Sequence, residues 1–262
     1  MNKRVSVICA TNRLDELFFN MLESVKKQDY DNIEVIVVLD GQVAFDNRLT
    51  DRNIKVLKND KPLGLTASLN KAIAESAGYY IARVDAKDIC EPDRISRQVL
   101  YLEGNGIDIV SCNVDVISEN GRLVKIVKPP STHEAIIKRM PRHNCFVHSS
   151  ILVKKEVLQA VGSYNERFIY AQDYDLYLRL ILKGCKFGVS PEILLHKRID
   201  VRSTTMSKRR WQICYAMAAQ SLYFAKAQPK NPLSIFFCIL SNLTRFILPI
   251  KFREIRINIW NR

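Results

Sequence analysis

The chain has 262 residues, 47% of them hydrophobic, and a formal net charge of +13 at pH 7. This content excludes a disordered chain and suffices for one large α/β domain, or for a domain of about 200 residues with an appendage. Seven scattered cysteines without a C-x-x-C pair, and a start at Met1–Arg4 that leads directly into a strand-like run, predict reduced cysteines and a cytosolic protein.

The first hundred residues alternate short apolar runs with helical patterns. We expect strands at Val5–Ala10, Ile33–Leu39, Ile54–Leu57 and Tyr79–Val84, and helices at Leu14–Val25, from Gly64 to near Gly78, and from Pro92 onward. Such alternation predicts an α/β fold with a mostly parallel, doubly wound sheet and helices on both faces. Ligands of these sheets bind beyond the carboxyl ends of the strands, so the loops after residues 10, 39 and 84 are the expected site.

Residues 105–200 are less regular. They predict strands at 107–112, 123–127 and 147–153 and a helix at Gln172–Lys183, which we interpret as an extension of the same sheet that forms the second wall of the site. Two more helices are expected at 207–226 and 232–248. The sequence therefore divides into a domain of residues 1–205 and a basic helical tail of residues 206–262.

Polar side chains suited to a nucleotide diphosphate follow three of the predicted strands. They are Thr11, Asn12 and Arg13 after the first strand, Asp40 after the second, and Arg83, Asp85, Lys87 and Asp88 after the fourth. Taken singly, an Asp-Gly is usually a turn, and an acid near a helix start is usually a cap. Together they fall on the ligand edge of one predicted sheet. Asp85 and Asp88 also offer the carboxylate oxygens that hard divalent cations prefer beside phosphates.

These segments resemble glycosyltransferase family 2, which has the GT-A fold. The matching stretches are Val5–Arg13, Val35–Gly41, Gly64–Ala72, Tyr80–Arg94, His148–Ser150, Ala171–Leu180 and Leu195–Ser203. The resemblance covers about residues 4–205. It implies transfer of a hexose or N-acetylhexosamine from a nucleotide diphosphate sugar, most simply a UDP-sugar, to a sugar hydroxyl of a lipid-diphosphate-linked surface polysaccharide.

The resemblance also implies roles for individual residues. Asp173 is the expected catalytic base, and the residues expected to bind the nucleotide sugar are Thr11, Asn12, Arg13, Asp40, Asn70, Arg83, Asp85, Ala86, Lys87 and Arg198. Asp85 and Asp88 are the expected ligands of Mg²⁺ or Mn²⁺. Direct displacement would invert the anomeric centre. Asp173 lies at the start of a predicted helix, where the helix dipole favours the ionised, proton-accepting carboxylate. We interpret His148 as structural.

Three departures from the family pattern bear on this interpretation. Lys87 replaces the middle carboxylate of the metal motif, Gln172 replaces a glutamate before Asp173, and Lys197-Arg198-Ile199-Asp200 replaces Tyr-Arg-x-His. Either Lys87 neutralises part of the diphosphate itself, or Asp85 and Asp88 still hold a metal while Lys87 points elsewhere. A third alternative is a catalytically impaired homologue that binds the sugar nucleotide.

The tail carries most of the excess charge. Residues 208–262 hold ten lysines and arginines and only one acid, Glu254. The apolar run Leu233–Ile250 is eighteen residues long and contains Arg245 and Pro249, so an interfacial helix fits better than a membrane span. The alternative is that this helix docks on the protein itself. We expect a cytoplasmic protein, peripheral on the inner face of the cell membrane.

Two other functions fit the sequence less well. A nucleic-acid-binding protein would explain the positive charge, but it would have no need of the acids at 40, 85, 88, 173 and 175, so we expect no nucleic-acid partner. A dinucleotide-dependent dehydrogenase needs a glycine-rich turn after its first strand, and Ala10–Leu14 contains no glycine.

Overall fold

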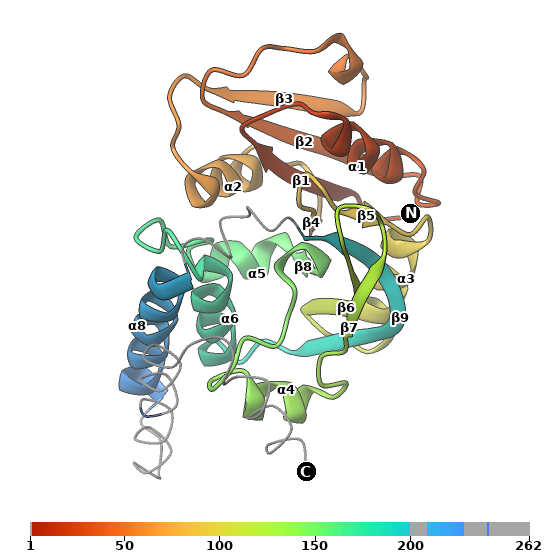
Figure 1. Cartoon of the computed structure of the whole chain (residues 1–262). Coiled ribbons are helices and arrows are strands. Elements are labelled where there is room, and N and C mark those ends of the chain that lie inside the picture. The colour runs from red at the N-terminus through yellow and green to blue at the C-terminus, as the bar shows by residue number, and fades with distance from the viewer. Residues whose placement is uncertain (1, 200–208, 228–239, 241–262) are drawn as a thin grey trace.

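A computed structural model describes residues 2–199, 209–227 and residue 240 (Figure 1). The nine strands in the described part of the chain form one sheet in the order β3-β2-β1-β4-β8-β6-β9-β5, with β7 paired on the side to β6. This sheet, with helices packed against it, confirms the predicted α/β fold class.

The first half of the sheet is parallel. Its elements are β1 (Val5–Thr11), α1 (Glu16–Lys26), β2 (Ile33–Asp40), the 3-10 helix η1 (Asn47–Leu49), β3 (Ile54–Asn59), α2 (Leu65–Ala74) and β4 (Tyr80–Arg83). In β1, Val5 lies opposite Ile33 of β2 and Tyr80 of β4. The carboxyl ends of all four strands therefore reach the same edge of the sheet, as the alternation predicts.

Beyond β4 the sheet is mixed. The elements are β5 (Ile89–Cys90), α3 (Arg94–Gly104), β6 (Ile109–Ile117), β7 (Leu123–Val127), α4 (His133–Arg139), the 3-10 helix η2 (His148–Ser150), β8 (Leu152–Lys154), α5 (Lys155–Ala160), α6 (Gln172–Leu182) and β9 (Phe187–Arg198). β8 runs antiparallel to both β4 and β6, whereas β9 is parallel to β6. This half extends the same sheet, in agreement with the sequence interpretation.

In this half, two predicted strands differ from the observed elements, and one observed strand was not predicted. The strand expected at 107–112 continues to Ile117, and the one expected at 147–153 is a turn of 3-10 helix followed by three extended residues. The twelve-residue strand β9 was not expected at all. Its pairing with β6 shifts register between Ser190 and Ile193, around Pro191, and this irregularity removes the alternation of two on which strand prediction depends.

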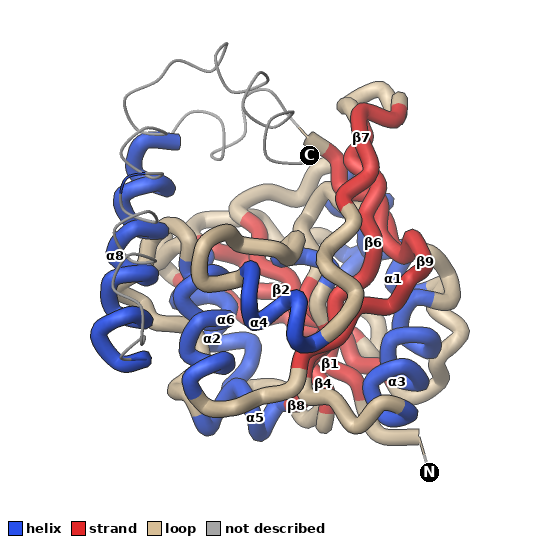
Figure 2. Tube along the Cα trace, turned by 90° about the horizontal axis from the view of Figure 1, so that it is seen from below, coloured by secondary structure: helices blue, strands red, loops and turns tan. Residues whose placement is uncertain are grey.

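Helices cover both faces of the sheet, as predicted. On one face, Phe18 and Leu22 of α1 and Leu102 of α3 pack with the inward residues of the strands. On the other, Leu69 of α2 and Leu176 of α6 do the same, together with residues of α5. Figure 2 shows α1 and α3 on one side of the strands and α2, α5 and α6 on the other.

The last described helix, α8 (Arg209–Ala227), matches the helix expected at 207–226 and lies beside α6 (Figure 1). Its buried Gln220 donates to Tyr174 Oη at 2.8 Å and to the Pro141 carbonyl at 3.1 Å. The helix expected at 232–248 lies outside the described residues, except for residue 240. The domain boundary predicted at residue 205 also lies outside them. None of the helices in the described ranges is long and apolar enough to span a membrane.

Candidate active site

The ends of β4 and β9 meet in a group of four charged residues, the charge cluster: Arg83, Asp85, Asp88 and Lys197. Lys197 Nζ lies 2.8 Å from Asp85 Oδ2, and Arg83 Nη2 pairs with Asp85 Oδ1. Burial opposes ionisation of Asp85, but the two neighbouring cations prevail and hold its pKa well below the usual value. Asp85 is therefore a permanent anion between two cations.

Arg83 is the most deeply buried cation of the cluster, with only 3% of its side chain exposed. Burial lowers the pKa of Arg83, but the Asp85 charge outweighs it and raises the pKa overall. Its Nε and Nη1 atoms are buried and have no hydrogen-bond partner. The cluster thus retains donors that Asp85 does not satisfy.

Asp88 lies beneath the surface, with 1% of its area exposed, and neither of its carboxylate oxygens has a hydrogen-bond partner. Burial raises the pKa of Asp88 to about 6, with Lys197 lowering it and Asp85 raising it. The amide of Asp88 donates to the Asp85 carbonyl at 3.1 Å, which closes a tight turn over the half-buried Ala86 and Lys87. The predicted contacts of Ala86 and Lys87 with a nucleotide stay predictions.

Asp40, at the end of β2, is held by three donors. Oδ1 accepts from Asn59 Nδ2 at 2.8 Å and from the Leu63 amide at 2.8 Å, and Oδ2 accepts from the Gly64 amide at 2.9 Å. Gly64 adopts φ +88° at the start of α2 and has no side chain to cap the helix, so Asp40 supplies the anion there. This structural role of Asp40 was not expected from the sequence. The nucleotide contact predicted for Asp40 stays a prediction.

Thr11, Asn12 and Arg13 lie after β1, at the same edge. Thr11 Oγ1 donates to the Arg13 carbonyl at 2.6 Å and accepts from the Arg13 amide at 3.2 Å, so the loop is closed by its own side chain. Asn12 and Arg13 are exposed, and Arg13 Nε pairs with Asp15 Oδ2 at 2.8 Å. Both side chains are accessible to a ligand above the sheet.

Asn70 acts in the structure as a clamp between α2 and the loop before α6. Its amide exchanges two hydrogen bonds of 2.9 Å with the backbone of Tyr164. The Tyr164 hydroxyl in turn lies 2.6 Å from His148 Nε2. Burial, followed by the Arg83 charge, lowers the pKa of His148 well below its usual value, so the ring is neutral near pH 7. His148 is thus a half-buried, hydrogen-bonded residue, consistent with a structural role.

Asp173 begins α6 and is half-buried, with Oδ2 accepting from Asn144 Nδ2 at 2.8 Å. Burial raises the pKa of Asp173, despite the opposing effects of Asn144, the Tyr174 amide and Arg83. The dipole argument made from the sequence is outweighed by this burial, and the carboxylate binds protons more strongly than a free one. Arg83 lowers the pKa of both Asp173 and His148, and the charges of Asp173 and Asp85 both raise that of Tyr164, so Asp173 lies within electrostatic reach of the charge cluster.

Arg198 points elsewhere. Its Nη1 donates to the Ser118 carbonyl at 3.5 Å and to the Glu119 carbonyl, in the turn between β6 and β7. Successive residues of a strand face opposite sides, so Lys197 reaches Asp85 and Arg198 does not. Sequence reasoning selected Arg198 and missed Lys197. The alternation within β9 would have identified Lys197 if that strand had been recognised.

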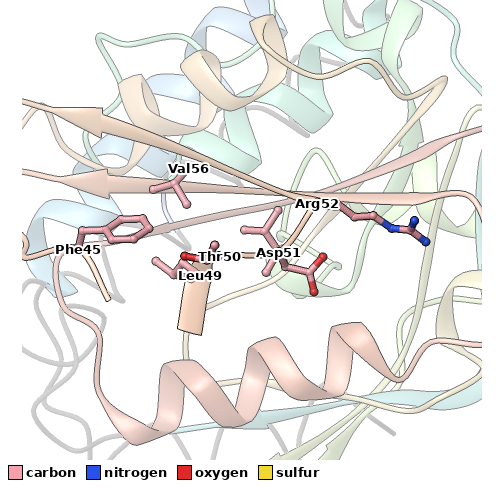
Figure 3. A pocket seen from close by; sticks show the side chains of 7 residues that line it. Phe45, Leu49, Thr50, Asp51, Arg52 and Val56 are labelled. Atoms are coloured by element: carbon pink, nitrogen blue, oxygen red, sulfur yellow. The ribbon is translucent and has the colours of Figure 1, made fainter. Parts of the chain in front are cut away.

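A shallow pocket of about 460 Å³ lies away from this edge, between η1 and β3. Figure 3 shows its lining side chains, among them Phe45, Leu49 and Val56, with the Arg52 guanidinium turned outward. None of the residues predicted for the site lines this pocket. The charge cluster and Asp173, rather than this hollow, define the candidate active site.

Comparison with known proteins identifies the family of this chain. Residues 6–162 match the family model described as glycosyl transferase family 2. The chain belongs to glycosyltransferase family 2. It is thus a glycosyltransferase, and the match includes the parallel half of the sheet and the turn that carries Asp85 and Asp88.

Relatives within the family have similar lengths. An uncharacterized glycosyltransferase of Methanocaldococcus jannaschii is 34% identical over 87% of this chain and 80% of its own. The O-antigen biosynthesis glycosyltransferase WbnJ of Escherichia coli is 32% identical over 80% of this chain and 85% of its own. The UDP-Gal:alpha-D-GlcNAc-diphosphoundecaprenol beta-1,3-galactosyltransferase of Escherichia coli is 28% identical over 95% and 94%, respectively.

Solved glycosyltransferase structures share the fold. S. aureus TarS (residues 1–349) in complex with UDP superposes with a TM-score of 0.67 at 16% identity, covering 97% of this chain and 78% of TarS. The mannosyltransferase PcManGT from Pyrobaculum calidifontis, in complex with GDP-Man and Mn²⁺, gives a TM-score of 0.65 at 17% identity, covering 92% and 70%. These neighbours support the GT-A fold predicted from the sequence.

The residues expected to hold Mg²⁺ or Mn²⁺ do not fit a divalent cation. Each Asp85 oxygen already carries a cationic partner, and Asp88 is buried with a pKa raised to about 6. Within the described ranges, no three acids, histidines or cysteines are grouped as ligands of a metal. A divalent cation prefers six or more oxygen ligands with an excess of negative charge, which the cluster does not offer.

The anchoring role of Asp40 leads to a prediction for stability. Burial opposes its ionisation, but hydrogen bonds from Asn59, Leu63 and Gly64 hold its pKa below the usual value. The resulting stabilisation is complete above the pKa of the unfolded carboxyl, about 4, and is lost as the pH falls through the lower folded pKa. Asp40→Asn should lower the free energy of unfolding by roughly 1–2 kcal/mol at pH 7, and by progressively less below pH 4.

Urea denaturation of both proteins between pH 7 and pH 3.5 measures this difference. Asp51→Asn is the control, because Asp51 is exposed and accepts a single 2.9 Å hydrogen bond, from the Asn53 amide. Its effect should stay within about 0.5 kcal/mol. Equal stability of wild type and Asp40→Asn at pH 7 would contradict the anchoring role.

Proposed function

We propose that this glycosyltransferase moves a hexose or N-acetylhexosamine from a UDP-sugar to a sugar hydroxyl of a lipid-diphosphate-linked saccharide in surface-polysaccharide assembly. The observation that carries the proposal is that Asp173, with its raised pKa, lies within electrostatic reach of Arg83, which belongs to the charge cluster together with Lys197. A transferase of this kind needs those two features together, a base for the acceptor and positive charge for the departing diphosphate. The named relatives act in O-antigen biosynthesis and on a diphosphoundecaprenol-linked sugar, which supports the acceptor class.

The donor occupies the carboxyl edge of the parallel strands in this proposal. Exposed Asn12 and Arg13 contact the nucleoside together with Asp40, which keeps free lone pairs beside its three hydrogen bonds. Arg83 and Lys197 supply charge toward the diphosphate. UDP and GDP-Man in the complexes of TarS and PcManGT support a nucleotide donor on this fold.

Asp173 takes the proton of the acceptor hydroxyl as the oxygen attacks the anomeric carbon, and the bond from that carbon to the diphosphate oxygen breaks. Attack on the face opposite the leaving group inverts the anomeric centre. Because burial raises the pKa of Asp173, its carboxylate accepts a proton more readily than an exposed aspartate. The neighbouring residue, Gln172, is 8% exposed and carries no charge. It therefore cannot replace Asp173 as the base at the start of α6.

The tail completes the proposal through its sequence. Its ten basic residues and the apolar run Leu233–Ile250 suit an anionic lipid surface, and a lipid-linked acceptor lies at such a surface. We propose a peripheral attachment to the inner face of the cell membrane through residues 229–262.

Binding of UDP tests the proposal directly. UDP at about 1 mM, well above a micromolar dissociation constant, should raise the melting temperature by several degrees, because a ligand that binds only the folded state stabilises it. Differential scanning fluorimetry with UDP, uridine and a DNA duplex measures the shift. Stabilisation by DNA and not by UDP would refute the transferase proposal in favour of a nucleic-acid-binding protein.

Asp173→Asn removes the proposed base. The turnover number for sugar transfer should fall by roughly 10²–10⁴-fold, while the dissociation constant for UDP changes little. Radiolabelled transfer to a lipid-diphosphate saccharide and calorimetric titration with UDP measure the two quantities.

Asp175→Asn is the matched control for Asp173→Asn. It removes the other acid in the first turn of α6, but Asp175 is buried against Arg179, with a distance of 2.8 Å between Arg179 Nε and Asp175 Oδ2. Turnover should be preserved in this variant. Normal transfer by Asp173→Asn would exclude Asp173 as the base.

Removal of residues 229–262 should release the protein from vesicles that contain anionic lipid. Sedimentation with vesicles of phosphatidylglycerol and phosphatidylcholine, at low and at about 0.5 M salt, measures the bound fraction, and added salt should weaken binding of the full chain by screening. Equal sedimentation of the full chain and the shortened chain would contradict attachment through the tail.

A further inference from the structure

The charge cluster has the opposite balance to a divalent-cation site. Asp85 uses one oxygen for the Arg83 guanidinium and the other for the Lys197 ammonium, so each oxygen of the carboxylate that a metal would need already has a cation of the chain beside it. A metal bound to Asp85 would therefore lie beside two cations of the chain, and their repulsion would oppose its binding. Asp88 does not offset this, because it is buried and turned away from solvent.

The two cations differ in how much of each is available to a ligand. Lys197 keeps 30% of its side chain exposed, and its ammonium has three donors, of which Asp85 uses one. Arg83 lies behind it, 3% exposed, with Nε and Nη1 unpaired. Lys197, the more exposed of the two cations, is therefore the one that can meet an anion directly, while the buried Arg83 guanidinium holds Asp85 in place and adds positive potential.

The sequence departures agree with this arrangement. The resemblance predicts an acid at position 87 and a tyrosine at position 197, and this chain has lysine at both. Each change adds a positive charge to the edge where the diphosphate is expected. Both lysines would repel a divalent cation. Lys87 also takes the place of a carboxylate that would bind one.

We infer that Lys197, held by Asp85 and supported by Arg83, binds the donor diphosphate directly and takes over the charge neutralisation that a divalent cation would supply. The inference rests on the proposed function for its donor. It makes Lys197 a substrate-binding residue and makes UDP binding independent of Mg²⁺ and Mn²⁺.

Isothermal titration of the full-length protein with UDP, in EDTA and in Mn²⁺, separates the two possibilities. The dissociation constant should agree within about threefold between the two buffers. Binding of UDP only in Mn²⁺, or at least about tenfold tighter there, would overturn the inference while leaving the proposed function intact. Absence of UDP binding in both buffers would instead refute the proposed function.

Lys197→Met, titrated in EDTA, tests the residue itself. Loss of a charge-assisted contact to phosphate should weaken UDP binding by about ten- to a hundredfold and leave uridine, which lacks the diphosphate, unchanged. Lys197→Arg keeps the charge and should retain UDP affinity within about fivefold. It also tests the inference if the methionine variant does not fold.

Lys154→Met is the matched control. Lys154 also forms a partly buried pair with an aspartate, at 2.7 Å from Asp108 Oδ1, but it lies opposite Tyr80 at the other end of β4. Its UDP affinity should equal that of wild type. An unchanged UDP affinity in Lys197→Met, or an equal loss in Lys154→Met, would overturn the assignment.

Discussion

The carboxylate of Asp85 joins two cations from strands that are not neighbours in the sheet. β8 and β6 lie between β4 and β9, yet Arg83 and Lys197 reach the same carboxylate, one at each oxygen. The chain itself makes this possible, because the turn after Asp85 leads directly into β5, which pairs with β9 where Ile89 lies opposite His196. Removing the anion would leave the buried Arg83 and the partly buried Lys197 without the charge that both are paired with, which is more costly than losing an exposed ion pair. The shape of the edge and its charge therefore depend on one side chain.

The position of the proposed base depends on a second set of contacts, which starts at Asp40 at the end of β2. Asp40 secures the start of α2, Thr66 in its first turn donates to the Phe168 carbonyl at 3.0 Å, and Asn70 one turn later holds Tyr164. These contacts fix the loop that precedes α6, and hence the entry of the chain into the helix that presents Asp173. A residue assigned to the nucleotide from its motif, Asn70, thus also determines where the base lies. Motif membership alone does not separate these two roles.

Local patterns were sufficient for the first half of the fold and insufficient for the site. The runs around Val35 and Leu69 have the periods of strand and helix, and the parallel sheet and its ligand edge follow from them. The irregular pairing around Pro191 hid β9, and with it the one-residue difference that directs Lys197 rather than Arg198 to Asp85. The spacing of Asp85 and Asp88 suggests a metal pair, but spacing carries no information on burial. The tertiary packing around Asp88 decides that it is a poor ligand.

Two aspartates of the candidate site acquire opposite properties from their surroundings. Asp85 is partly buried, yet two adjacent cations keep it ionised across the physiological range, which suits a residue that positions charge. Asp173 stands at a helix start, where the dipole favours the anion, but burial raises its affinity for protons, and the hydrogen bond from Asn144 only partly offsets this. A base must bind the proton that it removes, so the less stabilised carboxylate is the better candidate, and the more stabilised one is unsuited to proton transfer. The assignment of roles therefore follows from electrostatics as well as from the family pattern, and it requires that the cations which stabilise Asp85 remain paired with it rather than with Asp173.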